Sequence, residues 1–250
     1  MAVFAIGDLH LPGGDDKPMN VFGSHWDGHF ERIQADWKSK VGEEDVVLIP
    51  GDISWAMQVQ SAMPDLAAIG ALPGKKILLR GNHDYWWCAI TKLRDMLPKG
   101  MYAVQNDAML LDGIAFCGTR GWRLPTPGCD AEDEKIYNRE LQRMEMSLER
   151  AKAYGAHRLI VMCHYPPLGE GGAKTRLSAL LESYHPDDVV YGHLHGPSLR
   201  GAVTGCIDGI RYHCVSCDGL NFQVYRLPDD PVGIHPTEGS KPTAETQFCG

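Results

Sequence analysis

Five short polar clusters, each directly after a hydrophobic run, constrain the fold of this chain more than any other feature of its sequence. The clusters are Gly7-Asp8-Leu9-His10, Gly51-Asp52, Gly81-Asn82-His83-Asp84, His164 and Gly192-His193-Leu194-His195. The runs before them cover 3–6, 46–49, 76–79, 159–163 and 189–191, and a sixth run covers 114–117. Short continuous apolar runs are typical of strands buried on both faces, in a sheet covered by helices. The sequence therefore predicts a layered sheet with polar side chains at the strand ends.

Helical periodicity lies between these runs. Apolar residues recur at spacings of three and four in two segments, namely Trp26, Phe30, Ile33, Trp37 and Leu141, Met144, Leu148, Ala151. This spacing places each set on one face of a helix. Gly155 is expected as the C′ glycine that ends the second helix. The alternation of strands with helices predicts the α/β class.

The pattern changes near the C-terminus. Short strands are expected at 201–208, 210–216 and 222–225, joined by Gly-Asp turns, so that a meander closes the sheets. Residues 228–250 contain several Pro, Gly and Thr residues and are expected to form a loosely held tail. We therefore expect one domain over residues 1–227.

Composition limits the classes of function. The apolar fraction of 44% and the charged fraction of 22% are ordinary for a soluble globular protein. A net charge of −8 makes a nucleic-acid partner unexpected, but bound divalent cations would still attract a small anionic substrate. We expect a cytoplasmic protein without membrane contact, since no apolar run reaches the roughly 18–20 residues of a span and no signal peptide is recognisable. The eight cysteines are scattered, as expected for free thiols in a reducing compartment.

The polar clusters supply carboxylates, an amide and imidazoles, which are oxygen and nitrogen ligands for divalent metals and exceed what one metal needs. Asp8 and His10 alternate across Leu9, so an extended segment would point both to one side, and His193 and His195 repeat this arrangement. Any one cluster has a simpler explanation, since Gly-Asp is common in turns and a lone histidine is often structural. Their joint occurrence at strand ends favours a two-metal hydrolytic centre.

A second candidate site is the C-x-x-C pair formed by Cys214 and Cys217. Such a pair is found in redox sites and in zinc sites. Here no second pair exists and residues 212–215 are strand-like rather than a helix start. Redox or zinc chemistry is therefore the less favoured interpretation.

In order and content, the clusters from Asp8 to His195 resemble the five blocks of the calcineurin-like metallophosphoesterase superfamily. Residues 81–87 and 164–167 resemble a group of bacterial predicted phosphohydrolases. The resemblance implies two packed mixed sheets flanked by helices, a four-layer α-β-β-α sandwich, with two divalent metals (Mn, Fe or Zn) at the sheet edge. It implies that Asp8, His10, Asp52 and His195 hold the first metal. Asp52, Asn82, His164 and His193 would hold the second, so that Asp52 bridges.

His83 corresponds to the non-ligand histidine of the family, which protonates the leaving oxygen or stabilises the transition state. The alternative is that His83 is a further structural ligand. Many relatives carry an acid or amide three residues after the bridging aspartate, where it orients this histidine, but here that position is Trp55. Either Asp84 or another group orients His83, or its role is weaker.

Arg120, Arg123 and Tyr85 are candidate substrate contacts, because a guanidinium matches phosphate oxygens and an aromatic ring stacks on a base. Surface salt bridges are an equally good explanation for the two arginines. Of the aromatic residues Tyr85, Trp86, Trp87 and Trp122, at least two are expected in the core. The leading hypothesis is a phosphodiesterase or phosphatase acting on a small molecule or nucleotide. A nuclease of the same architecture and a non-catalytic scaffold are the alternatives.

Overall fold

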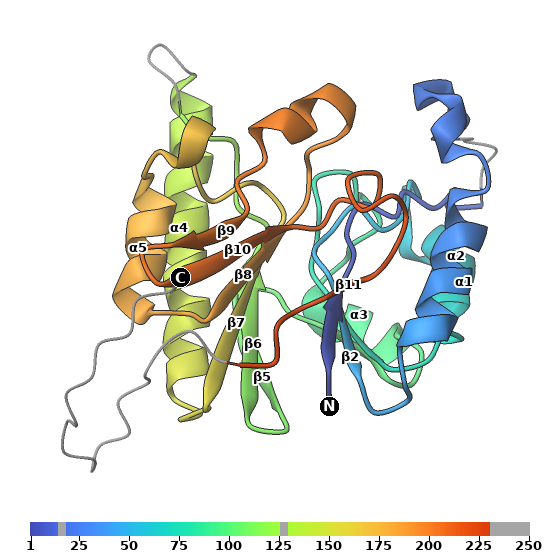
Figure 1. Cartoon of the computed structure of the whole chain (residues 1–250), viewed down its shortest axis with the longest axis horizontal. Coiled ribbons are helices and arrows are strands. Elements are labelled where there is room, and N and C mark those ends of the chain that lie inside the picture. Colours follow the sequence, from blue (N-terminus) through green and yellow to red (C-terminus); the bar gives the residue numbers. More distant parts are fainter. Residues whose placement is uncertain (15–18, 126–129, 231–250) are drawn as a thin grey trace.

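Two mixed sheets form the centre of the protein in its computed structural model, which describes residues 1–14, 19–125 and 130–230 (Figure 1). The first sheet has the order β11-β1-β2-β3-β4 and the second the order β5-β6-β7-β8-β10-β9. The first consists of β1 (Val3–Ala5), β2 (Val46–Ile49), β3 (Lys75–Leu78), β4 (Met101–Ala103) and β11 (Tyr225–Arg226). The second consists of β5 (Ala108–Leu111), β6 (Ile114–Thr119), β7 (Arg158–Cys163), β8 (Asp188–Tyr191), β9 (Gly205–Ile207) and β10 (Ile210–Cys214). The central strands of both sheets run parallel, and β5, β9 and β11 pair antiparallel with their neighbours.

Alternate residues of each central strand enter different cores. In β2, Val46 and Leu48 pack between the two sheets, whereas Val47 and Ile49 face the helices α1 (His29–Lys40), α2 (Val59–Gly70) and α3 (Ile90–Met96). The second sheet repeats this on its own outer side, where α4 (Ala131–Lys152) and α5 (Arg176–Tyr184) cover it. Period-two alternation explains how a wholly apolar strand serves two cores. The predicted α-β-β-α sandwich is confirmed.

Helix α4 begins and ends where local chemistry favours it. The side chain of Asp130 accepts a hydrogen bond from the backbone N–H of Glu132, which caps the helix N-terminus. Basic residues in the last turn, Arg150 and Lys152, complement the helix dipole. The helix ends at Lys152 with Ala153 as its C-cap, so the predicted C′ glycine lies one residue too late.

The apolar stripe predicted from Trp26 onwards spans two elements rather than one. Trp26 ends a short 3-10 helix, Ser24–Trp26, and α1 begins only at His29. Gly28 lies between them in the left-handed region with φ 57°, where the chain changes direction. Further single 3-10 turns cover Met19–Phe22, Glu170–Gly172 and Gly196–Gly201.

The predicted C-terminal meander is wrong. Of the strands in this part of the chain, β9 and β10 do form a hairpin, whose turn residues Asp208 and Gly209 both have positive φ, as a type I′ turn requires. β10 then pairs parallel with β8, and β11 crosses to the first sheet beside β1. Position 201 lies in a 3-10 helix rather than a strand. Strands this short have no periodicity of their own, so their partners are set by tertiary packing.

The end of the predicted domain contacts the second sheet. Arg158 donates to the carbonyl oxygens of Pro228 and Asp229 and forms an ion pair with Asp188, its Nη2 lying 2.6 Å from Oδ2. Residues 231–250 of the predicted tail lie outside the described residues. Among the helices of the described ranges, none combines the length and apolar character that crossing a bilayer requires.

The two thiols of the C-x-x-C pair lie in surroundings that favour their protonated form. The thiols of Cys214 and Cys217 are free, and Cys217 is buried with its Sγ 3.0 Å from the backbone oxygen of Asp8. Burial raises the pKa of Cys214 to about 11 and raises that of Cys217 as well. Protonated, buried thiols are poor nucleophiles and poor metal ligands.

Candidate metal centre

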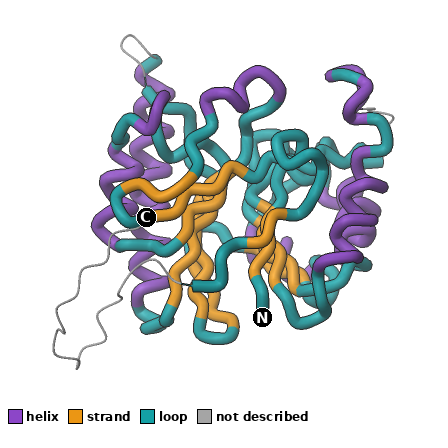
Figure 2. Tube along the Cα trace, viewed as in Figure 1, coloured by secondary structure: helices purple, strands orange, loops and turns teal. Residues whose placement is uncertain are grey.

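The polar clusters meet where the two sheets touch at the carboxyl ends of their parallel strands. Three clusters follow β1, β2 and β3 of the first sheet, and two follow β7 and β8 of the second. The sheets are joined directly here, since Gly7 N–H donates to the carbonyl of Val215 at 2.7 Å. Figure 2 shows the loops of both sheets gathering at this end. The layered fold therefore brings residues 8 and 195 to one place.

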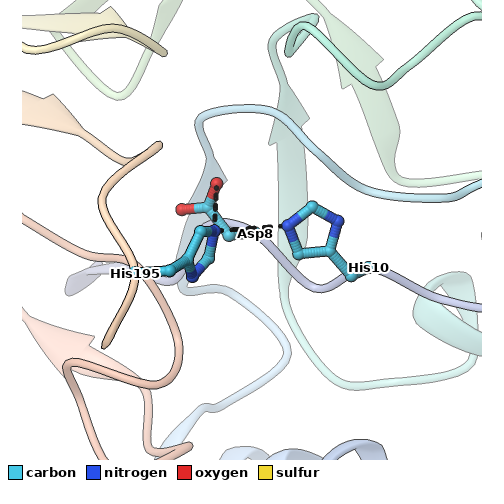
Figure 3. A group of neighbouring side chains, drawn as sticks. All are labelled: Asp8, His10 and His195. Atoms are coloured by element: carbon cyan, nitrogen blue, oxygen red, sulfur yellow. Dashed lines mark hydrogen bonds and ion pairs between the residues drawn. The ribbon is translucent and has the colours of Figure 1, made fainter. Parts of the chain in front are cut away.

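One group of ligand atoms consists of Asp8, His10 and His195 (Figure 3). The Nε2 atoms of His10 and His195 are 3.3 Å apart, and His195 Nε2 lies 3.5 Å from Oδ1 of Asp8. Oδ2 of Asp52 lies 3.8 Å from His10 Nε2. All four side chains of the first predicted metal position thus converge.

A second group adjoins the first. His164 Nε2 lies 2.6 Å from Oδ1 of Asn82, and His193 Nδ1 lies 2.9 Å from the same oxygen. Asp52 Oδ2 is 3.5 Å from His164 Nε2. Within the described residues, Asp8, Asp52 and His164 also form a group whose ligand atoms all lie within 4.8 Å. The structure therefore places all seven predicted ligands in one cluster, of which Asp8, His10, Asp52 and His164 are buried and the other three are partly exposed.

The backbone at these residues differs from the predicted extended form. Asp8, His10, Asp52 and His193 have φ values of 57°, 46°, 52° and 74°. Non-glycine residues rarely adopt this left-handed region, and such strain persists where surrounding structure enforces it, often at functional sites. Asp8 and His10 converge because the chain turns after β1, not because they alternate along a strand.

Two glycines allow the backbone to approach the carboxylates. A Cβ at position 81 would lie 2.1 Å from Oδ1 of Asp52, and one at position 192 would lie 2.3 Å from Oδ2 of Asp8. Any side chain at either position would displace a ligand. The glycine in these clusters is a steric requirement of the centre.

The ligand atoms fit divalent cations. In two histidines the ring nitrogen that points away from the centre is hydrogen-bonded, so the other ring nitrogen can face a metal. His164 Nδ1 is 3.0 Å from the carbonyl of Pro50, and His195 Nδ1 is 2.9 Å from Oδ1 of Asp218. If these Nδ1 atoms carry the proton, Nε2 presents a lone pair to the centre, as metal-binding histidines do. Asp218, buried behind His195, was missed by sequence reasoning, because Asp218-Gly219 resembles an ordinary turn.

The electrostatic field of the centre favours positive charge. Burial alone would lower the pKa of His195, but hydrogen bonds with Asp218 and a second carboxylate outweigh it and raise this pKa to about 10. At His164 burial is likewise outweighed by carboxylates, and the pKa rises to about 8. Burial dominates at His10 and His193 and lowers the pKa of each to about 4. The carboxylates that favour a proton on His164 and His195 would equally favour a cation, and a metal would compete with that proton.

His83 lies beside this cluster. Its backbone N–H donates to Oδ1 of Asp52 at 2.8 Å, and its ring centroid is 4.6 Å from that of Trp55. Asp84 serves another purpose: it accepts hydrogen bonds from the backbone N–H groups of Gly81 and Asp52, among others, and from the indole of Trp86. Asp84 thus ties together the loops after β2 and β3. The ring of Trp55 packs against His83, at the position where the resemblance led us to expect a polar partner.

The candidate substrate contacts have different surroundings. Arg123 forms an ion pair with Asp133 at 2.6 Å, while the guanidinium of Arg120 lies 4.6 Å from the ring centroid of Trp122. Tyr85 is exposed, with its ring 6.4 Å from that of His83. The expected core packing of two tryptophans is confirmed, because Trp86 and Trp87 are buried.

Solved structures share this architecture. Phosphopantetheinyl hydrolase PptH from Mycobacterium tuberculosis superposes with a TM-score of 0.53 at 16% identity, over 94% of this chain and 98% of that one. TT1561 of Thermus thermophilus superposes with a TM-score of 0.50 at 12% identity, over 77% of this chain and 81% of that one. At such identities the likeness concerns the fold.

Two phage proteins and one family are similar to this chain in amino-acid sequence. The Gene 66 protein of Mycobacterium phage D29 is 27% identical over 207 residues, covering 81% of this chain and 82% of the phage protein. The Gene 66 protein of Mycobacterium phage L5 is 22% identical over 194 residues, covering 77% and 76%. The model of the calcineurin-like phosphoesterases matches residues 1–197, which include all five polar clusters but not Asp218. With that match and the buried Asp and His clusters at the sheet edge, the chain belongs to the calcineurin-like phosphoesterase family.

Proposed function

We propose that this protein is a dinuclear metal-dependent phosphoesterase that hydrolyses a small phosphomonoester or phosphodiester. The observation that carries the proposal is that imidazole nitrogens and carboxylate oxygens converge at distances of 3.3–3.8 Å. If the outer nitrogens of the imidazoles carry the protons, none of these converging atoms can donate a hydrogen bond to another. Divalent cations satisfy such a set, and the donor mixture suits Mn, Fe or Zn better than Mg. Bound there, they would lower the pKa of water and neutralise phosphoryl oxygens.

Asp52 is the proposed bridging ligand. Its Oδ2 lies 3.8 Å from Nε2 of His10 and 3.5 Å from Nε2 of His164, the nitrogens that face the two positions. Asp8 also approaches His164, but at Nδ1, which is the atom that is hydrogen-bonded to the carbonyl of Pro50. Asp8 therefore belongs with His10 and His195, and Asp52 is shared.

His83 is the proposed proton donor to the leaving oxygen. It lines the cavity beside the centre together with Asp52, His193 and His195. A histidine is suited to this transfer because its usual pKa lies near neutrality. The hydrogen bond from the backbone N–H of His83 to Asp52 fixes the distance of His83 from the metal centre.

A panel of phosphomonoesters and phosphodiesters, assayed in turn with Mn²⁺, Zn²⁺ and Mg²⁺, tests the proposal. We expect hydrolysis of small esters with Mn²⁺ or Zn²⁺, weaker hydrolysis with Mg²⁺, and none after chelation. A matched assay with single-stranded DNA should show no hydrolysis. Lack of turnover of every small ester with every metal would contradict the proposed function, and turnover of DNA alone would identify the chain as a nuclease.

A further inference from the structure

A cavity of about 310 Å³ opens directly beside the candidate metal centre. The histidines of the centre line it, and beside them lies a wall of aromatic and apolar side chains. The wall residues are Met19, Phe22, Trp26 and Trp55. This volume is at the lower end of the roughly 300–1,000 Å³ of small-molecule sites. The cavity therefore has room for one ring system rather than for a polymer.

The aromatic wall starts at the ligands themselves. The ring of Trp55 stacks on that of His10, with centroids 4.7 Å apart and planes inclined by 19°. Trp26 is held edge-on to His10 at 6.3 Å, and the indole N–H of Trp55 lies 3.2 Å from the sulfur of Met19. The wall thus packs directly against His10, a proposed metal ligand.

Phe22 completes the wall on its open side. It lies at the end of the 3-10 helix Met19–Phe22, and 62% of its surface is exposed. Its neighbour Val21 is also exposed, at 73%, but does not line the cavity. The exposed ring of Phe22 is therefore a free stacking face next to the centre.

The charge of the cavity lining further limits the class of substrate. Among the described residues that line this cavity there is no lysine or arginine, so positive charge there comes from the histidines and the proposed metals. A second phosphate group would find no partner in the cavity. An uncharged group therefore fits this cavity better than a second phosphate does.

The geometry points to a substrate class: phosphoesters in which a flat aromatic group, a nucleobase or an aryl ring, stacks on Phe22 while the phosphoryl group lies at the metals. This inference rests on the proposed function. Aromatic faces favour planar partners through offset stacking, and Met19 is the one unbranched aliphatic side chain of the wall. An alkyl chain would use the same apolar surface without this geometric match.

Two matched substrates isolate the aromatic group. Adenosine 5′-monophosphate and ribose 5-phosphate share the scissile bond and differ in the base. We expect kcat/KM about tenfold or more higher for the nucleotide, as stacking of one base typically provides. If only diesters are turned over, the methyl esters of the same two phosphates replace them. Phenyl phosphate and hexyl phosphate form a second pair that distinguishes an aryl ring from a nucleobase and from an alkyl chain.

The variants Phe22→Ala and Val21→Ala locate the effect. Phe22→Ala should lower the preference for the aromatic ester about tenfold, Phe22→Tyr should retain it, and Val21→Ala should leave both substrates as in the wild type. A Phe22-dependent preference for the nucleotide, or for phenyl phosphate alone, supports the inference and identifies the source of the ring. Equal turnover within both pairs, or equal dependence of hexyl phosphate on Phe22, overturns it while the proposed function stands. Lack of turnover of all four esters and of the corresponding methyl diesters, with all metals, overturns both.

Discussion

Replacing Asp52 with Asn is expected to empty both predicted metal positions and to abolish turnover. The change keeps the volume of the side chain and an oxygen for the backbone N–H of His83, so the fold should persist. It removes the negative charge that faces His10 and His164. Loss of a residue that only supports a ligand already lowers metal affinity about 10–100-fold, so loss of a shared ligand should lower it at least about a hundredfold. Metal content by mass spectrometry after dialysis measures the effect.

Asn82→Ala is the matched control. Asn82 contacts His164 and His193 but belongs to the second position alone, so this variant should lose one metal and keep the other. A bridging role for Asp52 is contradicted if Asp52→Asn loses a single metal, as Asn82→Ala should. Unchanged circular dichroism in both variants excludes unfolding as the cause.

Replacing His83 with Asn is expected to lower kcat about 10²–10⁴-fold while metal content stays at the wild-type level, since general acid catalysis contributes rate enhancements of this size. The loss should be large for an alkyl ester, whose leaving oxygen needs a proton. It should be much smaller for a nitrophenyl ester, whose leaving group departs as a stable anion. This difference between leaving groups separates proton donation from a general disturbance of the site.

Tyr85→Phe controls for changes in the same loop. Its ring lies near His83 and is exposed, so removal of the hydroxyl should leave the leaving-group dependence unchanged. Unchanged turnover in His83→Asn would overturn the proposed mechanism. Loss of metal in that variant would instead identify His83 as a ligand, the alternative that the sequence left open.

The sequence predicted the parts of the fold that depend on continuous apolar runs. β2 begins and ends as expected at 46–49. A strand that is buried on both faces consists of apolar residues alone, so its ends are recognisable in the sequence. The same logic located the ligand clusters, since parallel strands end at one edge of a sheet. Asp8 and His195 are far apart in sequence but follow strands that end beside each other.

Features that arise from tertiary contacts were beyond sequence reasoning. The left-handed turns at Asp8 and Asp52 are imposed by surrounding loops. Aspartate adopts this region more often than most residues, but the residue alone does not predict it. Asp218 approaches His195 only because β10 pairs with β8 and carries the following turn to the centre. The aromatic wall has the same origin. Phe22 and Trp26 lie in two short 3-10 helices, and the apolar spacing that starts at Trp26 predicted a single helix and no wall.

The central claim is that two metals share Asp52, and anomalous diffraction from crystals grown with Mn²⁺ tests it most directly. The account predicts two anomalous peaks roughly 3.5–4 Å apart, with the carboxylate of Asp52 between them. One peak should be ligated by His10 and His195, and the other by His164 and His193. A single peak, or two peaks of which only one contacts Asp52, would contradict the account.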